Sequence, residues 1–418
     1  MSLFKIGLLA VMSMMLTSCG NLLSLRDDLI QTKNSFIRLS GEIDSPFCSA
    51  CPIIVVAMGD RSGKDIHAYR VFEGSGSFQM NALVTTHHLF AFNDLNNDFE
   101  YQPDEPSGWY DLPASAAFTG RVDRIDFDIK PLAVDATGWP AMGNLFDLRK
   151  GHSALLSTQL GLKVGLDDAR FDPDLATLGM WQPLHFARQG YVGIYFVEEY
   201  SPEKTPVLFV HGINGSPRDF AVMVAKLDHK KFQPWFMYYP TGLDLRVLGD
   251  GMFGMLSELN HRYPFIHLHI VAHSMGGLVA RSYLSGCVRD DHCEYVRSFT
   301  SISTPFGGQP EAKNGLDYSP VVMPVWKSIV PGSRFLQGLF RRPMPSGVPH
   351  YLLFSYLNTS VTSFASGDGT IMLNSQLRPE AQAQATALRG FDEDHLSVLT
   401  EDAVFAYLNG VLAMHDPK

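Results

Sequence analysis

The sequence predicts an α/β protein in which a small β-sandwich precedes a larger domain built on a mainly parallel sheet. From about Ser35 to Leu132, short runs rich in β-branched and aromatic residues alternate with Gly, Asp, Ser and Asn turns, as in a sandwich. From Gly190 onwards, strand-like runs alternate with helical patterns, as in a parallel sheet covered on both faces. The 418 residues are 45% hydrophobic and 18% charged, which is typical of two or three packed domains.

The charge balance narrows the classes of partner. The net charge is −10, and the sequence has no long run of like charge and no obvious internal repeat. Binding to nucleic acid needs a basic surface, so nucleic acid is excluded as the main partner.

Residues 1–18 have the pattern of a signal peptide, with Lys5 followed by an apolar stretch too short for a permanent membrane-spanning helix. Its end, Leu-Thr-Ser-Cys at 16–19, resembles the lipobox of bacterial lipoproteins, which are cleaved before the cysteine and lipidated on it. The resemblance implies an acyl anchor on Cys19 and a location in the bacterial cell envelope, at the outer membrane. Residues 19–34 are then expected to form a polar tether. The alternative is an ordinary signal peptide with a chance cysteine.

The other four cysteines occur in two close pairs, Cys48 with Cys51 and Cys287 with Cys293. An oxidising compartment favours two local disulfides, each of which closes a short loop and stabilises the fold only modestly. The CxxC pair has two alternative interpretations, a redox pair or half of a zinc site. No second CxxC and no thioredoxin-like pattern follows it, which favours a structural bridge.

In the sandwich region, over 35–132, strands are predicted at "SFIRLSGEI", "PIIVVAMG", "IHAYRVFEG", "SFQMNALV", "HHLFAFND" and "RVDRIDFDIK". An acidic loop lies between the last two, and its residues Asp94, Asn96, Asp98 and Glu105 have the spacing of a calcium-binding loop. The match is partial because Phe99 occupies the position of the usual glycine. The sequence therefore leaves two alternatives, a structural calcium site or a solvated acidic hairpin loop.

Residues 133–189 are predicted to be a connector, and residues 190–418 the parallel-sheet domain. Strands are expected in "YVGIYFVEEY", "TPVLFVHG", "FQPWFMYYP", "FIHLHIVA", "VRSFTSIST" and "HYLLFSY". Helices are expected in "SPRDFAVMVAKLD", "LRVLGDGMFGMLSELNHRY", "GGLVARSYLSG" and "EDAVFAYLNGVLAM". Sites in such sheets lie at the carboxyl ends of the strands.

The segment "IVAHSMGGLVARSYL" places Ser274 between a strand and a helix. A serine hydroxyl is a poor nucleophile unless it is exposed, paired with a base and close to an oxyanion site. A tight strand-to-helix turn meets the first requirement, and it needs small residues two positions on either side of the serine. Gly276 and Ala272 fill these positions. Because S-x-G alone is a weak signal, the rest of a catalytic site must be found elsewhere in the chain.

The chain supplies the remaining groups in the required order, with an oxyanion donor upstream and an acid and a histidine downstream. The amides of Ile213, which follows "HG" at a strand end, and of Met275 are the candidate oxyanion donors. Asp368 lies in a Gly-flanked loop after a strand, and His395 precedes the last helix. His395 is expected to take the proton of Ser274 while Asp368 fixes its tautomer.

Residues from about 190 to 418 resemble the α/β-hydrolase lipases and esterases. The resemblance rests on "HGINGSP", "AHSMGG", "STPFGG", "SGDGTI" and "DHLSVL", and it does not cover the N-terminal half. It implies an α/β-hydrolase fold, and the apolar segment at about 310–349 resembles the cap that lipases insert into the sheet. That segment is expected either to form an acyl-chain pocket or simply to pack on the core.

These observations predict a lipid-anchored serine hydrolase that cleaves carboxylic esters, with hydrophobic or lipid esters as substrates. The chemistry needs no cofactor, and any calcium is structural. Two alternatives remain open. The same triad serves an amidase, a thioesterase or an acyltransferase, and a surface lipoprotein that only binds its ligand would need no turnover. The sequence does not indicate the oligomeric state.

Overall fold

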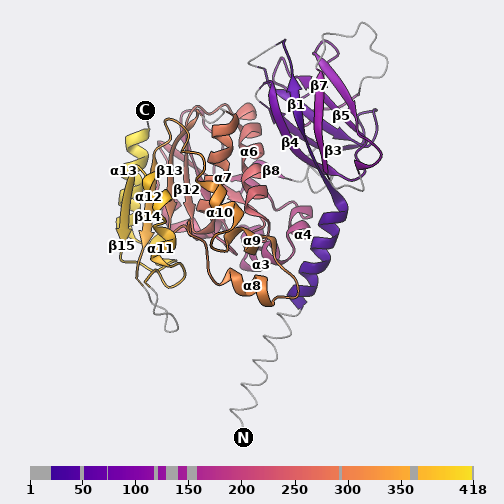
Figure 1. Cartoon of the computed structure of the whole chain (residues 1–418). Coiled ribbons are helices and arrows are strands. Elements are labelled where there is room, and N and C mark those ends of the chain that lie inside the picture. Colours follow the sequence, from indigo (N-terminus) through magenta and orange to yellow (C-terminus); the bar gives the residue numbers. More distant parts are fainter. Residues whose placement is uncertain are drawn as a thin grey trace.

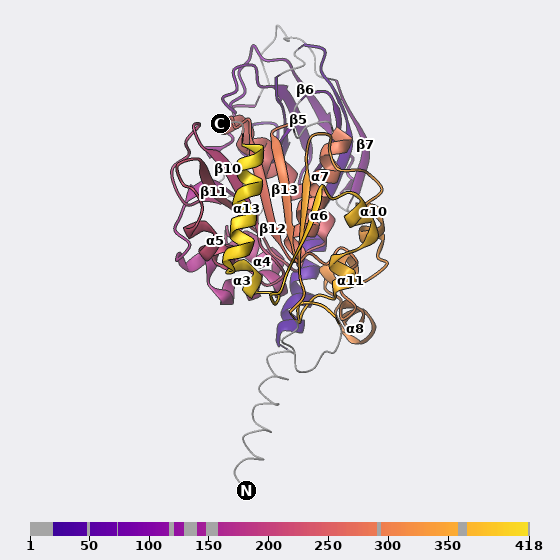
Figure 2. The same cartoon turned by 90° about the vertical axis from the view of Figure 1, so that its left-hand side faces the viewer.

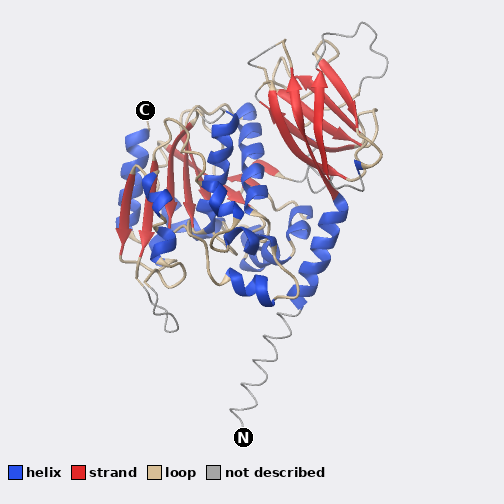
Figure 3. Cartoon of the chain, in the orientation of Figure 1, coloured by secondary structure: helices blue, strands red, loops and turns tan. Residues whose placement is uncertain are grey.

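The computed structural model describes residues 20–47, 51–72, 74–116, 121–128, 140–147, 158–290, 294–357 and 366–416. A small domain of two sheets stands beside a larger domain built on one wide sheet (Figures 1 and 3). The predicted class, an α/β-hydrolase sheet preceded by a separate small β-domain, is confirmed.

The N-terminal domain consists of two sheets that share one core. The strand orders are β4-β1-β7 and β3-β2-β5-β6. Their bounds are β1 (Phe36–Asp44), β2 (Ile53–Met58), β3 (Ile66–Phe72), β4 (Gly76–Leu83), β5 (His88–Asn93), β6 (Ser107–Asp111) and β7 (Arg121–Asp128). Side chains alternate across the strands, so Leu39 and Val55 meet between the sheets. Val56 faces the outer side of β2, where Phe99 and Tyr101 of the acidic loop cover it.

The large sheet has the strand order β15-β14-β13-β12-β10-β11-β9-β8. The bounds are β8 (Gln159–Lys163), β9 (Gly193–Phe196), β10 (Thr205–Val210), β11 (Phe232–Tyr238), β12 (Leu268–His273), β13 (Val296–Ile302), β14 (His350–Ser355) and β15 (Ala387–Phe391). The strands from β15 to β11 are parallel, and β9 runs antiparallel to β11. The carboxyl ends of the six parallel strands therefore meet at one edge of the sheet.

Helices cover both faces of this sheet, and the alternating strand side chains explain why (Figure 2). Leu208 and Ile270 pack on one face against α6 (Leu245–Arg262) and α7 (Met275–Asp290). Phe209 and Val271 pack on the other face against α5 (Ala221–Ala225) and α13 (Asp402–His415). Between β13 and β14 the chain forms the short helices α8 (Ala312–Tyr318), α9 (Pro324–Ile329) and α10 (Arg334–Leu339), in the segment expected to be a cap.

The prediction of a connector over 133–189 was wrong in its second half. β8 pairs with β9 and forms the edge of the large sheet, so that sheet begins at Gln159 and not after 190. The 3-10 turn η2 (Ala169–Phe171) and two proline-initiated helices, α3 (Pro173–Trp181) and α4 (Pro183–Arg188), follow it. These elements are short, and their prolines begin helices here instead of marking a loop.

The prediction of a polar tether over 19–34 was also wrong for the described part, because residues 20–35 form a helix. Leu25 is fully buried in the core of the large domain. The carboxylate of Asp28 accepts hydrogen bonds from the amides of Leu184 (2.9 Å) and His185 (2.9 Å) at the start of α4. This helix is therefore docked on the large domain.

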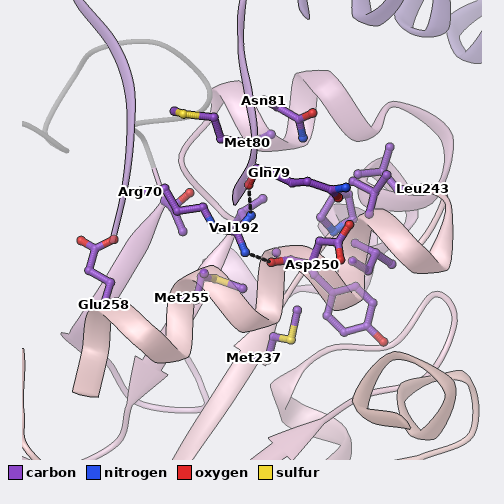
Figure 4. A pocket seen from close by; sticks show the side chains of 18 of the residues that line it. Arg70, Gln79, Met80, Asn81, Val192, Met237, Leu243, Asp250, Met255 and Glu258 are labelled. Atoms are coloured by element: carbon purple, nitrogen blue, oxygen red, sulfur yellow. Dashed lines mark hydrogen bonds between the residues drawn. The ribbon is translucent and has the colours of Figure 1, made fainter. Parts of the chain in front are cut away.

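The two domains also meet along α6. Tyr69 of β3 donates a hydrogen bond to Glu258. The Arg70 guanidinium donates to the carbonyls of Gln79 (2.6 Å) and Asp250 (3.3 Å) (Figure 4). A cavity of about 280 Å³ lies at this junction and is lined by residues of both domains. The sandwich is thus held to the large domain by buried polar contacts as well as by the chain.

Two sequence predictions fall largely outside the described residues. Cys51 and Cys287 take part in disulfides, whereas Cys48 and Cys293 lie outside the described residues, so the pairings stay predictions. Cys19 lies outside them as well. No helix within the described ranges is long and apolar enough to cross a membrane.

Candidate active site

Ser274 occupies the turn between β12 and α7, at the carboxyl edge of the sheet. Its φ is +53°, a left-handed conformation that a non-glycine residue adopts only where the surrounding structure holds it there. Two residues later, a Cβ on Gly276 would lie 2.2 Å from the carbonyl oxygen of Val210, so only glycine fits against the end of β10. On the other side Ala272 is fully buried and fits without strain in the strand.

His395 links Ser274 to Asp368. Its Nε2 lies 2.9 Å from the Ser274 Oγ, and its Nδ1 lies 2.8 Å from the Asp368 Oδ2. Because Asp368 is ionised and can only accept, Nδ1 carries the proton and Nε2 is the acceptor for the serine hydroxyl. The structure therefore brings together the three predicted catalytic residues, which are 121 and 27 positions apart along the chain.

Asp368 is 1% exposed and receives hydrogen bonds on both carboxylate oxygens. Its Oδ1 accepts from the amides of Thr370 (3.0 Å) and Ile371 (2.6 Å). Burial raises the pKa of this carboxyl, but the hydrogen bond and charge of His395 and the two amides outweigh burial and hold the pKa below its usual range. The acid is therefore ionised at neutral pH despite its burial.

Ser355 and Gln376 also hold the Asp368 carboxylate, and nothing in the linear sequence singled them out. Ser355 Oγ donates to Asp368 Oδ2 over 2.9 Å, and Gln376 Nε2 donates to the same oxygen over 3.1 Å. Their positions, at the end of β14 and the end of α11 (Leu373–Gln376), become adjacent only in the folded chain. In the sequence, the only feature that could have indicated their role was a polar residue at the end of each element.

His273 has a positioning contact that the sequence did not reveal. Its Nε2 donates to the backbone carbonyl of His395 over 2.8 Å, and the two rings lie 4.7 Å apart. Burial, followed by repulsion from His395, lowers the pKa of His273 to about 3, so the ring is neutral and can serve as a fixed donor. His273 therefore holds the backbone of the candidate catalytic base in place.

The predicted oxyanion donors lie at the expected ends of two elements. Ile213 follows β10, and Met275 is the first residue of α7, whose N-terminus favours developing negative charge. The loop before Ile213 is fixed by His211, whose ring stacks on Tyr239 at 4.3 Å and whose Nδ1 donates to the Gly212 carbonyl over 2.8 Å. Burial lowers the pKa of His211 to about 4, so this support is uncharged at neutral pH.

A mostly apolar pocket of about 390 Å³ opens beside Ser274 and His395. Helices α8 and α9 of the inserted segment contribute to its wall, so the segment both packs on the core and lines a cavity. Its apolar lining includes Ile213, Trp326, Ile329, Ile371 and Leu396. A cavity of this size and character suits an apolar group of a small ligand.

In the acidic loop, the two buried carboxylates accept hydrogen bonds from backbone amides of the loop itself. Asp94 accepts from the amides of Asp98 (3.1 Å) and Phe99 (2.9 Å), and Glu105 accepts from those of Leu95 (2.8 Å) and Gln102 (3.0 Å). Phe99 has φ +62°, the conformation for which calcium loops use glycine at this position.

Within the described ranges, no group of three or more His, Cys, Asp or Glu side chains is arranged to hold a metal ion. Asp98 instead accepts from Asn96 over 2.8 Å. The prediction of calcium at Asp94, Asn96, Asp98 and Glu105 therefore stays a prediction.

Part of the chain is similar to known proteins. Residues 202–333 match the model of a family described as "Putative serine esterase (DUF676)". Among the curated proteins, none matches the chain. Similar solved structures include a lipase of Bacillus licheniformis in its mature form, with 19% identity, a TM-score of 0.43, and coverage of 51% of this chain and 94% of that chain. They also include lipase B of Aspergillus fumigatus, with 15% identity, a TM-score of 0.41, and coverage of 54% and 56%.

The matched segment runs from β10 through the nucleophile turn to the inserted helices. It contains Ser274 and both candidate oxyanion donors, whereas Asp368 and His395 lie beyond it. The large domain therefore has an α/β-hydrolase sheet, and its segment around Ser274 is similar to the family described as putative serine esterases.

Proposed function

We propose that the protein hydrolyses esters with hydrophobic acyl groups by forming an acyl-enzyme on Ser274. The observation that carries this proposal is the continuous hydrogen-bonded chain from Asp368 through His395 to Ser274 at the apolar pocket. Such a chain supplies a nucleophile, a base in the correct tautomer and an ionised acid that orients the base.

The steps follow from the geometry. His395 Nε2 takes the hydroxyl proton as Ser274 Oγ attacks the ester carbonyl, and the amides of Ile213 and Met275 stabilise the oxyanion. His395 then gives this proton to the departing alkoxide, which leaves as the alcohol. Water attacks the acyl-enzyme with His395 as base, releasing the carboxylic acid and restoring Ser274. Asp368 stays ionised and stabilises the imidazolium that forms in each half-reaction.

Labelling with a fluorophosphonate probe tests the nucleophile. We expect the wild-type chain to be labelled and Ser274→Ala to be unlabelled. Ser298→Ala is the matched control, because Ser298 also contacts a histidine, His269 Nδ1 at 2.7 Å, but is fully buried in the sheet. Equal labelling of wild type and Ser274→Ala, with correct folding, would overturn the proposal.

A scan of acyl esters of increasing chain length tests the substrate class. We expect activity to rise with chain length until the pocket is filled. Trp326→Ala enlarges the pocket and should move the preference towards longer chains. Trp109→Ala, in the distant sandwich domain, is the control and should leave the profile unchanged. A wild-type profile that does not depend on chain length would contradict a hydrophobic substrate.

The bond and the acceptor have alternatives that use the same three residues. Amides, thioesters and acyl transfer to an alcohol differ only in the leaving group or in what attacks the acyl-enzyme. Parallel assays with the amide, the thioester and an added alcohol acceptor discriminate between them. Good folding with no turnover on any of these substrates would favour a lipoprotein that only binds its ligand.

We also propose that the protein is anchored in the bacterial envelope through a lipid on Cys19, at the outer membrane. The support is the sequence at 16–19 and the preceding apolar stretch. Cys19→Ser should move the protein from the membrane fraction to the soluble fraction without changing esterase activity. Retention of the variant on the membrane would contradict the anchor.

A further inference from the structure

Asp368 lies on the segment between β14 and α11. Residues 358–365, which precede it, lie outside the described residues, and the described part after them begins at 366. An isolated bridge pairs Gly367 with Met372, and α11 follows. The backbone of Asp368 is held on one side by the amide of His395, which donates to its carbonyl over 3.0 Å, and α11 holds the segment on the other side.

Gln376 joins α11 to β14. Its Oε1 accepts from the amide of Ser355 (3.0 Å), and its Nε2 lies within hydrogen-bond distance of the carbonyls of Ser355 (3.0 Å) and Ile371 (3.2 Å) and of Asp368 Oδ2 (3.1 Å). The residue is 1% exposed. One buried amide thus ties the last residue of β14 to both ends of the acid turn.

Ser355 holds the same oxygen from the strand side. Because the ionised Asp368 can only accept, the Ser355 hydroxyl must donate to it, and the hydroxyl of Ser303, 2.6 Å away, must then donate to Ser355. Both serines are fully buried. With His395, the oxygen Oδ2 has three donors, and their directions are fixed by the charge of the acid.

We propose that Gln376 and Ser355 are positioning residues for the hydrolytic reaction, holding the Asp368 carboxylate ionised and aimed at His395 Nδ1. They touch neither the pocket nor Ser274, so they act through Asp368 alone. This inference rests on the proposed function. It adds two residues to the candidate site that cannot be identified from the order of nucleophile, acid and base along the chain.

Kinetics of Gln376→Met and Ser355→Ala test the inference. Each variant loses one hydrogen bond to a charged group, and we expect kcat to fall about 10- to 100-fold with KM unchanged. Ser375→Ala is the matched control. Ser375 is the neighbouring residue of α11, is equally buried and donates to the Gly308 carbonyl (2.6 Å), but it does not reach Asp368. Folded fractions are measured for all variants by circular dichroism.

The pH profile separates positioning from simple structural support. Two titratable side chains, His395 and His273, act on Asp368. In Gln376→Glu a second carboxylate replaces the donor, so ionised Asp368 becomes less favourable. We expect the acid limb of kcat to move to higher pH in Gln376→Glu and in Gln376→Met, and to stay in place in Ser375→Ala.

The inference is overturned if the Gln376 and Ser355 variants keep wild-type kcat, or if they lose activity only in proportion to the unfolded fraction with an unmoved acid limb. A wild-type chain that the fluorophosphonate probe does not label would instead overturn the proposed function. The two failures are therefore distinguishable.

Discussion

Each of the two domains buries a carboxylate, and the pKa values of these two carboxylates are shifted in opposite directions. Asp368 in the large domain is 1% exposed, and Glu105 in the sandwich is 3% exposed. Partners in the chain hold the pKa of Asp368 below its usual range, whereas burial raises the pKa of Glu105 to about 7. Burial alone therefore does not predict the charge of a carboxylate.

The difference lies in what faces each group. Asp368 accepts hydrogen bonds from the imidazole of His395, the hydroxyl of Ser355, the side-chain amide of Gln376 and two backbone amides. Glu105 receives two backbone amides but faces Asp94 and Asp98, whose negative charges raise its pKa further. The negative charge of Asp368 is stabilised by hydrogen-bond donors. Among the described residues that shift the pKa of Glu105, none is a cation. Three predictions test this contrast.

The largest expected effect is on catalysis. Asp368→Asn removes the charge that fixes the tautomer of His395, and we expect kcat to fall by about 10⁴-fold, as in other triads. Asp94→Asn is the control, since Asp94 is equally buried at 1% exposure. Steady-state assays should show little change for Asp94→Asn, within about two-fold. Similar losses in the two variants would mean that the effect comes from burying an altered acid and not from the triad.

The second prediction concerns stability and pH. In the folded chain Glu105 keeps its proton up to about pH 7, whereas the ordinary value is 4.5. The folded state binds more protons between these values, so stability falls as pH rises through this window, by roughly 3 kcal/mol in total. This loss of folding stability is absent below pH 4.5 and complete above about pH 7. Glu105→Gln should reduce the slope in a chemical denaturation series. An unchanged slope would contradict the burial argument.

The sequence predicted that Ser274, Asp368 and His395 lie together because it carries a local turn pattern and a fixed order of serine, acid and histidine. The strand-to-helix turn needs small residues around Ser274, and the order of acid and histidine along the chain is fixed by the sheet. Gln376 and Ser355 could not be predicted, since their common partner is brought to them only by the return of α11 to β14. The helix over 20–35 was missed although Leu22, Leu25 and Leu29 have helical spacing, because its burial depends on α4.

The smallest expected effect is that of calcium, which would give Glu105 the cation it lacks. Position 6 of the loop already has the left-handed conformation, and the carboxylates of Asp94 and Glu105 are buried with no competing Lys or Arg among the causes of their pKa shifts. A cation at Asp98 would compete with the hydrogen bonds that its Oδ2 accepts from Asn96 (2.8 Å) and Gln102 (2.8 Å). At calcium concentrations 100 times the dissociation constant, the folded state gains about 2.7 kcal/mol.

Thermal unfolding with calcium or with a chelator measures this gain. We expect calcium to raise the Tm of the wild-type chain and to remove the fall in stability between pH 4.5 and 7, because the bound cation favours ionised Glu105. Asp98→Ala, which removes the ligand oxygen at position 5, should lose both effects. Asp104→Asn, an exposed acid in the same loop at a position that provides no ligand, should keep them. If calcium changes neither the Tm nor the pH slope of the wild type, the loop is a solvated acidic hairpin, and Glu105 stays neutral up to about pH 7, where Asp368 is already charged.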